Sequence, residues 1–221
     1  MRFSLVKRKI KLLLRNKKKV FVIGFNKTGT TSIEKALLDL GYLVGNQREG
    51  ELLFDDIQKG KFEGLIRYCK KSEAFQDVPF SLPGIYKILY KSFPDARFIL
   101  SIRKDPEIWY NSLVEFHSKL WFGGENPSVE RLKHVNYIYE GYSYKVMNYI
   151  YQTQDVYNKE NCIYTYQKHN EEVKAFFIDK EDQLLELDIS TEDSYLKLCQ
   201  FLNCKPLGNS FPWENKTVEI L

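Results

Sequence analysis

The feature that most constrains the fold is an apolar run that passes directly into a glycine-hinged loop. Residues Val20 to Ile23 are all apolar, and Gly24 and Gly29 delimit the loop that follows. The run predicts a buried strand, and the residues after Gly29 predict a helix. In such a turn successive backbone N–H groups point at one spot, and the helix adds its unpaired N-terminal donors and positive dipole end. The stretch therefore predicts an anion cradle that fits a phosphate or sulfate group.

This loop differs from the phosphate loop of nucleoside triphosphatases. Gly24 and Gly29 have the spacing of G-x-x-x-x-G-K-[ST], but Thr30 stands where the lysine belongs, and the lysine is Lys27. Nucleoside triphosphatases use the later lysine to reach the outer phosphates and the next hydroxyl to hold magnesium. The loop is therefore poorly built for metal-assisted ATP chemistry, although a nucleotide or small-molecule kinase and an ordinary strand-to-helix turn stay open as alternatives.

A second strand-to-helix junction follows later in the chain. Residues 96–102 form an apolar run that predicts a buried strand ending at Arg103, and Asp105 and Pro106 are residue types preferred at a helix N-cap and first position. Ligands bind at the carboxyl ends of strands in open α/β sheets, so this guanidinium is well placed for a phosphate. Ser112 shares a helical face with Asp105 and offers a second donor. Taken alone, Arg103 and Ser112 fit ordinary surface positions as well as they fit phosphate binding.

Together these residues resemble a known family. Residues 26–31 (Asn-Lys-Thr-Gly-Thr-Thr) look like the 5'-phosphosulfate loop of sulfotransferases that use 3'-phosphoadenosine 5'-phosphosulfate (PAPS). The family's 3'-phosphate pattern, an arginine after a strand and a serine about nine residues later, is similar to Arg103 and Ser112. Residues 211–215 (Phe-Pro-Trp-Glu-Asn) resemble the closing segment of one branch, and the resemblance spans residues 20–217. It implies PAPS as donor, adenosine 3',5'-bisphosphate (PAP) as product, no metal, and a donor site made of Asn26, Lys27, Thr28, Gly29, Thr30, Thr31, Ser32, Arg103 and Ser112.

The resemblance also suggests catalytic residues. Lys27 would neutralise charge on the bridging oxygen as the bond to the sulfuryl group breaks. Residues 73–79 predict a strand whose end brings Asp77 to the same sheet edge as Lys27 and Arg103. Sulfotransferases place a base, histidine in many members and a carboxylate in others, at about this position, where Asp77 would take the proton of an acceptor hydroxyl or amine. Asp77 can also be a turn cap before Pro79. The competing bases are His117, His134 and His169.

Strands that alternate with helices predict an α/β fold: a single-domain three-layer sandwich with a mainly parallel central sheet. A chain of 221 residues with 43% hydrophobic content can bury one such core. We expect a domain over residues 20–221 and a separate basic segment over residues 1–19. The four cysteines form no C-x-x-C pair and are interpreted as reduced thiols in a cytosol-like compartment.

The basic segment carries much of the positive charge. Residues 1–19 hold nine Lys or Arg and no acidic residue, whereas the rest of the chain holds 24 basic and 29 acidic residues. The apolar run in this segment is too short to span a membrane. It is either a solvated lead-in or an interfacial helix that makes peripheral membrane contact. No nucleic-acid partner is expected, because the remainder is acidic and shows no base-reading motif.

The acceptor is less constrained than the donor. Residues 127–177 predict long helices rich in tyrosine, which suit a pocket for sugars, phenols or lipid head groups but are also explained by helix packing. A small molecule, a saccharide and a lipid all stay open as acceptors. A non-catalytic nucleotide-binding protein and a membrane-attached interaction protein are further alternatives to an enzyme.

Overall fold

A four-stranded parallel sheet forms the centre of the protein. The computed structural model describes residues 17–211, and all positional statements refer to them. The strands are β1 (Val20–Val22), β2 (Ala74–Phe75), β3 (Arg97–Ser101) and β4 (Leu184–Leu187), in the spatial order β2-β1-β3-β4. In this register Phe21 pairs with both Phe75 and Phe98. All four carboxyl ends therefore meet at one edge of the sheet.

Helical segments connect the strands. Between β1 and β2 lie α2 (Thr30–Asp39), α3 (Gln47–Glu51), α4 (Phe54–Gln58) and α5 (Glu63–Cys69), and α6 (Ile85–Ser92) joins β2 to β3. Between β3 and β4 lie α7 (Pro106–Trp121), α8 (Val129–Leu132), α9 (Tyr142–Tyr151), α10 (Lys159–Phe176) and a 3-10 turn at Glu181–Gln183; α11 (Ser194–Leu202) follows β4.

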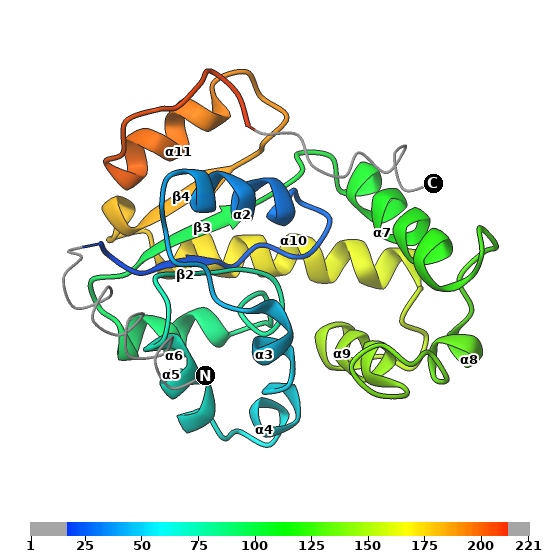
Figure 1. The fold of residues 1–221 in the computed structure, drawn as a ribbon. Coiled ribbons are helices and arrows are strands. Elements are labelled where there is room, and N and C mark those ends of the chain that lie inside the picture. The colour runs from blue at the N-terminus through cyan, green and yellow to red at the C-terminus, as the bar shows by residue number, and fades with distance from the viewer. Residues whose placement is uncertain (1–16, 212–221) are drawn as a thin grey trace.

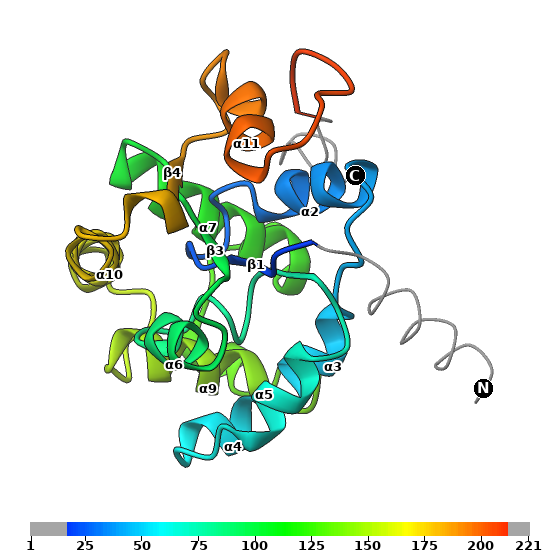
Figure 2. The same cartoon turned by 90° about the vertical axis from the view of Figure 1, so that its left-hand side faces the viewer.

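Helices cover both faces of the sheet. Side chains of α2 and α11, such as Leu37 and Leu198, pack on one face against Val22 and Ile99. The opposite face packs against α6 and α10, with α3, α4, α5 and α9 beyond them. Figure 2 shows the sheet between these two layers, with α2 and α11 on one side and α6 and α10 on the other. The predicted three-layer α/β fold with a parallel sheet is confirmed.

Most predicted junctions are observed within a few residues. Asp105 caps α7, because its Oδ1 accepts a hydrogen bond from Glu107 N at 2.8 Å, and Pro106 is the first helical residue. The strand expected over residues 73–79 is shorter, since only Ala74 and Phe75 pair with β1. Asp77 has a positive φ of 57°, which turns the chain away from the sheet direction.

The outer edge of β2 is covered by a neighbouring segment. Val44 forms an isolated parallel bridge with Ala74. Glu73 N donates to Leu43 O at 2.8 Å, and Gly45 N donates to Ala74 O at 2.9 Å. Residues 43–45 therefore act as a short additional strand beside β2.

Two lysines of the predicted basic segment contact the domain. Lys17 Nζ donates to Leu40 O at 2.7 Å and lies 4.0 Å from the centre of the Tyr42 ring. Lys19 Nζ donates to Cys69 O at 2.7 Å and to Ser72 O at 2.8 Å, at the end of α5. These two residues pack with the folded domain, whereas residues 1–16 and 212–221 lie outside the described part. Membrane contact through residues 1–19 and the resemblance at residues 212–215 stay predictions.

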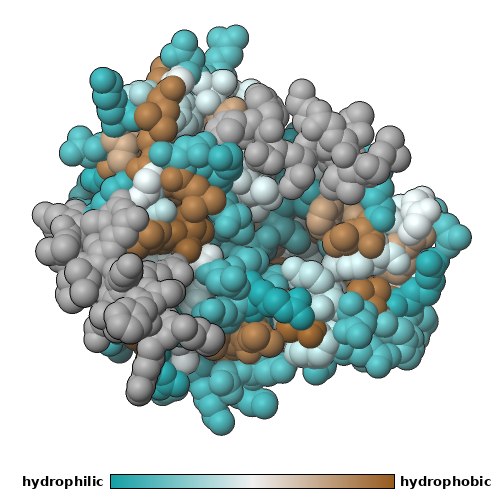
Figure 3. All heavy atoms as spheres, in the orientation of Figure 1, coloured by the Kyte–Doolittle hydropathy of each residue, from teal (hydrophilic) through white to brown (hydrophobic). Residues whose placement is uncertain are grey.

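The surface seen in Figure 3 is mostly hydrophilic, with hydrophobic side chains in separate groups. Large exposed apolar residues, among them Leu38, Leu52 and Ile108, come from separate parts of the chain. Within residues 17–211, no helix has both the length and the apolar character needed to cross a membrane. All four cysteines are free, and three of them are buried.

Gly24 is the position where the sheet tolerates no side chain. A Cβ there would lie 2.1 Å from Ser101 O and 2.4 Å from Ser101 Oγ. We expect Gly24→Ala to lower the free energy of unfolding by about 2–3 kcal/mol, as overpacking of a tight interior does, and the melting temperature by about 5–10 °C. Gly208→Ala is the matched control, because nothing lies within 4 Å of its Cβ position. Equal melting temperatures for the two variants would contradict this account.

Candidate active site

The loop after β1 is the segment for which the sequence predicts an anion cradle. Lys27 and Gly29 both have left-handed backbone conformations, with φ of 65° and 91°. Alternation of left- and right-handed residues turns successive N–H groups toward one side of a loop. Among the described residues, no protein group accepts a hydrogen bond from the backbone N–H groups of residues 28–32. The loop and the first turn of α2 therefore present a row of unused donors.

The side chains of this loop have different roles from its backbone. Thr28 is 1% exposed; its Oγ1 donates to Phe25 O at 2.5 Å and lies 2.6 Å from Ser101 Oγ. Thr30 and Ser32 are also buried, whereas Thr31 is exposed. The hydroxyl of Thr28 thus anchors the loop to β3. The backbone N–H groups, and the hydroxyl of Thr31, are what the cradle offers to an anion.

Arg103 is tied to the same loop. Its Nε donates to Lys27 O at 2.9 Å. The hydroxyl of Tyr166 on α10 accepts from Arg103 N at 2.8 Å and donates to Arg103 O at 2.9 Å. The two predicted phosphate-binding segments are therefore in direct contact. Ser112 lies half-buried on α7, the helix that follows Arg103.

Asn26 fixes the start of α7 against the loop. Its carbonyl oxygen accepts a hydrogen bond from Trp109 Nε1 at 3.0 Å. The Trp109 ring in turn stacks on Tyr166 with ring centroids 4.3 Å apart. These contacts place Arg103 on a rigid support, because its neighbours on α7 and α10 are buried aromatic side chains.

Lys27 lies near three other charged side chains, those of Arg103, Asp77 and Glu115. Its Nζ is 3.8 Å from the centre of the Phe116 ring. Burial, and then the nearby Arg103 guanidinium, lower the pKa of Lys27 from 10.5 to about 8, against the opposing effects of Asp77 and Glu115. The ammonium is thus less stable than that of an exposed lysine. An anion bound in the cradle would favour its charged form.

Asp77 lies at the carboxyl end of β2, as the sequence predicts. Its Oδ1 accepts a hydrogen bond from Val78 N at 2.8 Å. Burial raises the pKa of Asp77 above 3.8, while the Val78 N–H and the charge of Lys27 oppose that rise. A carboxylate with a raised pKa is a better proton acceptor than an ordinary aspartate.

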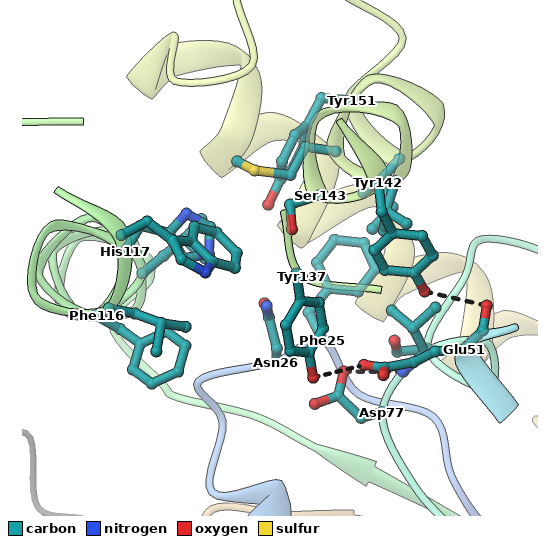
Figure 4. Close-up of a pocket in the computed structure, with 18 residues that line it drawn as sticks. Phe25, Asn26, Glu51, Asp77, Phe116, His117, Tyr137, Tyr142, Ser143 and Tyr151 are labelled. Atoms are coloured by element: carbon teal, nitrogen blue, oxygen red, sulfur yellow. Dashed lines mark hydrogen bonds between the residues drawn. The ribbon is translucent and has the colours of Figure 1, made fainter. Parts of the chain in front are cut away.

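A cavity of about 170 Å³ opens beside these residues. In Figure 4, Asp77 and Glu51 lie at one side of it, and Phe116 and His117 of α7 face them from the other. Tyr142 and Ser143 of α9 complete the wall drawn there. The full lining consists of Phe25, Asn26, Glu51, Asp77, Val78, Ser81, Leu113, Phe116, His117, Leu120, Trp121, Tyr137, Tyr142, Ser143, Val146, Met147, Ile150 and Tyr151.

Glu51 is a carboxylate of this cavity that the sequence did not indicate. It ends α3, which Asn46 caps by accepting a hydrogen bond from Glu49 N at 3.0 Å. Burial raises the pKa of Glu51 to about 7, and the charge of Asp77 adds to that rise. The capping asparagine is the only local signal for α3. It does not reveal that the helix ends against Asp77.

The three candidate histidines occupy different environments. His117 lines the cavity, and burial, followed by the charge of Lys27, lowers its pKa to about 3. His169 is buried behind Phe25, with ring centroids 4.5 Å apart, and its Nε2 is 2.9 Å from Ile23 O. His134 is exposed and pairs with Glu140 at 3.0 Å. Only His117 of the three borders the cavity.

Glu34 is a further acidic residue near the loop. Burial raises the pKa of Glu34 on α2, and Asp77 contributes to that rise. Gln76 Nε2 donates to Glu34 Oε2 at 3.4 Å. Over residues 17–211, no group of three or more His, Cys, Asp or Glu side chains is arranged to hold a metal ion.

Comparison with known proteins assigns the family. A search of curated proteins found no match. A family model described as a sulfotransferase domain matches residues 19–220, which includes the cradle, Arg103, Asp77 and all four strands. The chain belongs to this sulfotransferase domain family.

Proposed function

We propose that this protein transfers a sulfuryl group from PAPS to a hydroxyl or amine of an acceptor and releases PAP. The observation that carries the proposal is the hydrogen bond from Arg103 Nε to Lys27 O at 2.9 Å. It joins the row of unused N–H donors to an arginine whose terminal nitrogens form no ion pair or hydrogen bond with the other described residues. A donor that carries a 5'-phosphosulfate and a 3'-phosphate on the same ribose requires two anion-binding elements so close together.

The donor would be held at two places. The backbone N–H groups of residues 28–32 would bind the 5'-phosphosulfate, together with the dipole of α2. Arg103 and Ser112 would bind the 3'-phosphate, since a guanidinium forms strong charge-assisted hydrogen bonds with phosphate. This second contact distinguishes PAPS from ATP, which lacks a 3'-phosphate.

The transfer needs one cation and one base. The bond between sulfur and the bridging oxygen of the 5'-phosphate breaks as sulfur bonds to the acceptor oxygen or nitrogen. Lys27 would stabilise the charge that develops on the bridging oxygen. Asp77 would take the acceptor's proton. His117 is the weaker candidate base, because its pKa of about 3 leaves it little affinity for a proton.

Titration calorimetry with PAP tests the proposal. We expect PAP to bind without magnesium and more tightly than ATP with magnesium, because only PAP places a phosphate at Arg103. Arg103→Ala should weaken PAP binding by roughly 10- to 100-fold, as loss of a charged hydrogen bond does. Arg131→Ala on α8 is the matched control, since that arginine is exposed and pairs with Glu125. Magnesium-dependent ATP binding tighter than PAP binding would favour a kinase instead.

Lys27→Ala separates catalysis from binding. We expect kcat for sulfuryl transfer to fall by roughly two to three powers of ten, because a group that stabilises transition-state charge is lost. The dissociation constant for PAP should change much less, since the backbone cradle remains. Single-turnover rates with labelled PAPS measure the first effect and calorimetry the second. Wild-type turnover in Lys27→Ala would remove this residue from the mechanism, and binding without any turnover in the wild type would indicate a non-catalytic protein.

The lowered pKa of Lys27 predicts an alkaline limit to activity. The required form is the ammonium, which the free enzyme loses as pH rises through about 8. Because kcat/KM reports ionisations of the free enzyme, a plot of log kcat/KM against pH should bend downward near pH 8. Lys27→Arg should remove this bend, because arginine stays charged. The same bend in the variant would assign it to another group.

A further inference from the structure

The side chains that line the cavity beside Asp77 include two acidic groups and no lysine or arginine. Among the 18 lining residues, the acidic ones are Glu51 and Asp77. His117 is neutral near pH 7, because its pKa is lowered to about 3. The lining itself therefore offers a ligand two carboxylates and no cation, and the charge of Lys27 reaches Asp77 and His117 from outside the lining. Such a lining disfavours anionic acceptors, including acidic saccharides, by like-charge repulsion.

The size and lining of the cavity limit the acceptor further. A dry protein cavity of roughly 150 Å³ accommodates a benzene ring, so about 170 Å³ fits one ring with a short substituent. Aromatic side chains from several elements form much of its wall, including Phe116, Trp121 and Tyr137. These surfaces suit a compact ring rather than a long acyl chain or an oligosaccharide.

Glu51 is the carboxylate that the proposed mechanism does not use. It is 7% exposed, and its Oε1 accepts hydrogen bonds from Gln47 Nε2 at 3.3 Å and Tyr137 OH at 3.2 Å. Both distances are at the long end of the normal range. Glu51 forms no ion pair with a described residue. Figure 4 shows its carboxylate beside the Tyr137 hydroxyl, on the same side of the cavity as Asp77.

Burial is the largest effect on the pKa of Glu51 and raises it; the charge of Arg48, which lowers it, is the smallest, and Arg48 forms no ion pair with the carboxylate. A buried carboxylate that no cation contacts directly is costly, because little water remains to solvate its charge. An ammonium group placed beside Glu51 would supply the missing charge and hydrogen-bond donors. The Tyr137 hydroxyl donates to Glu51 Oε1 and the Tyr142 hydroxyl donates to the backbone oxygen of Glu51, so two aromatic residues lie beside this carboxylate and offer cation–π attraction to an ammonium.

We propose that the acceptor is a small, ring-containing compound with a protonated amine, which Glu51 binds while the reacting hydroxyl lies at Asp77. This inference rests on the proposed sulfuryl transfer and deepens it. The ring fills the aromatic cavity, and the ammonium pairs with the Glu51 carboxylate. Asp77 remains free to take the hydroxyl proton as the new sulfur–oxygen bond forms.

Three probes of similar shape test the acceptor class: tyramine, 4-ethylphenol and 3-(4-hydroxyphenyl)propanoate. They share a phenol and differ in carrying a positive, neutral or negative substituent. Binding is measured by calorimetry at pH 8, with and without PAP, where Glu51 is ionised because its pKa is about 7. We expect tyramine to bind at least tenfold more tightly than 4-ethylphenol, and the propanoate to bind most weakly. Equal affinities, or no binding by any of the three, would overturn the proposal.

Two matched variants locate the effect. Glu51→Gln should reduce the affinity for tyramine to that for 4-ethylphenol, because it removes the charge and keeps the shape. Glu49→Gln makes the same change on the same helix, but Glu49 is exposed and pairs with Lys71 at 3.8 Å, so the preference for tyramine should persist. Melting curves and PAP titration check that both variants are folded. A preference for tyramine that survives Glu51→Gln would reject Glu51 as its source.

The outcomes separate this inference from the proposed function. If PAP binds but the three probes are not distinguished, only the acceptor class is wrong. If tyramine binds through Glu51 but PAP does not bind, the proposed donor is wrong, and the ligand preference of the cavity stands.

Discussion

The hydrogen bond between the hydroxyls of Thr28 and Ser101 holds the loop after β1 against the end of β3, and the geometry of the whole site depends on it. The contact is possible because Gly24 has no side chain where the two strands meet. Buried hydroxyl pairs of this kind fix a single arrangement, since separating them leaves polar groups unsatisfied. Arg103 adds a second connection to the same loop through Lys27 O. The cradle and the arginine are thus parts of one rigid unit.

Within this unit, burial disfavours the charged forms of both Lys27 and Asp77. The positive charge of Lys27 and the negative charge of Asp77 stabilise one another. The guanidinium of Arg103 further disfavours the ammonium. An anionic ligand in the cradle would reverse that balance at Lys27. Ligand binding and proton uptake are therefore linked at mildly alkaline pH. The site is arranged so that full charge on the lysine is most favourable when the anion is present.

The sequence was sufficient for the fold and for the position of the loop after β1 between strand and helix, and less so for the side chains around the cavity. Strand-loop-helix junctions are local patterns, which is why α7 begins at Pro106 as predicted. Asp77 was found because parallel strands bring their carboxyl ends to one edge. Glu51 was not, since its position depends on how α3 packs against distant residues such as Tyr137. No local pattern encodes such a contact. The buried role of the Thr28 hydroxyl likewise follows from Ser101, which lies 73 residues away.

The segment at residues 43–45 has a consequence for the behaviour of the chain in concentrated solution. Strands at the border of a sheet can recruit strands from other molecules, which leads to aggregation. β2 is such a border strand, but it has only two residues, and the hydrogen bonds of residues 43–45 already occupy groups on its outer side. That border therefore offers little template for intermolecular pairing.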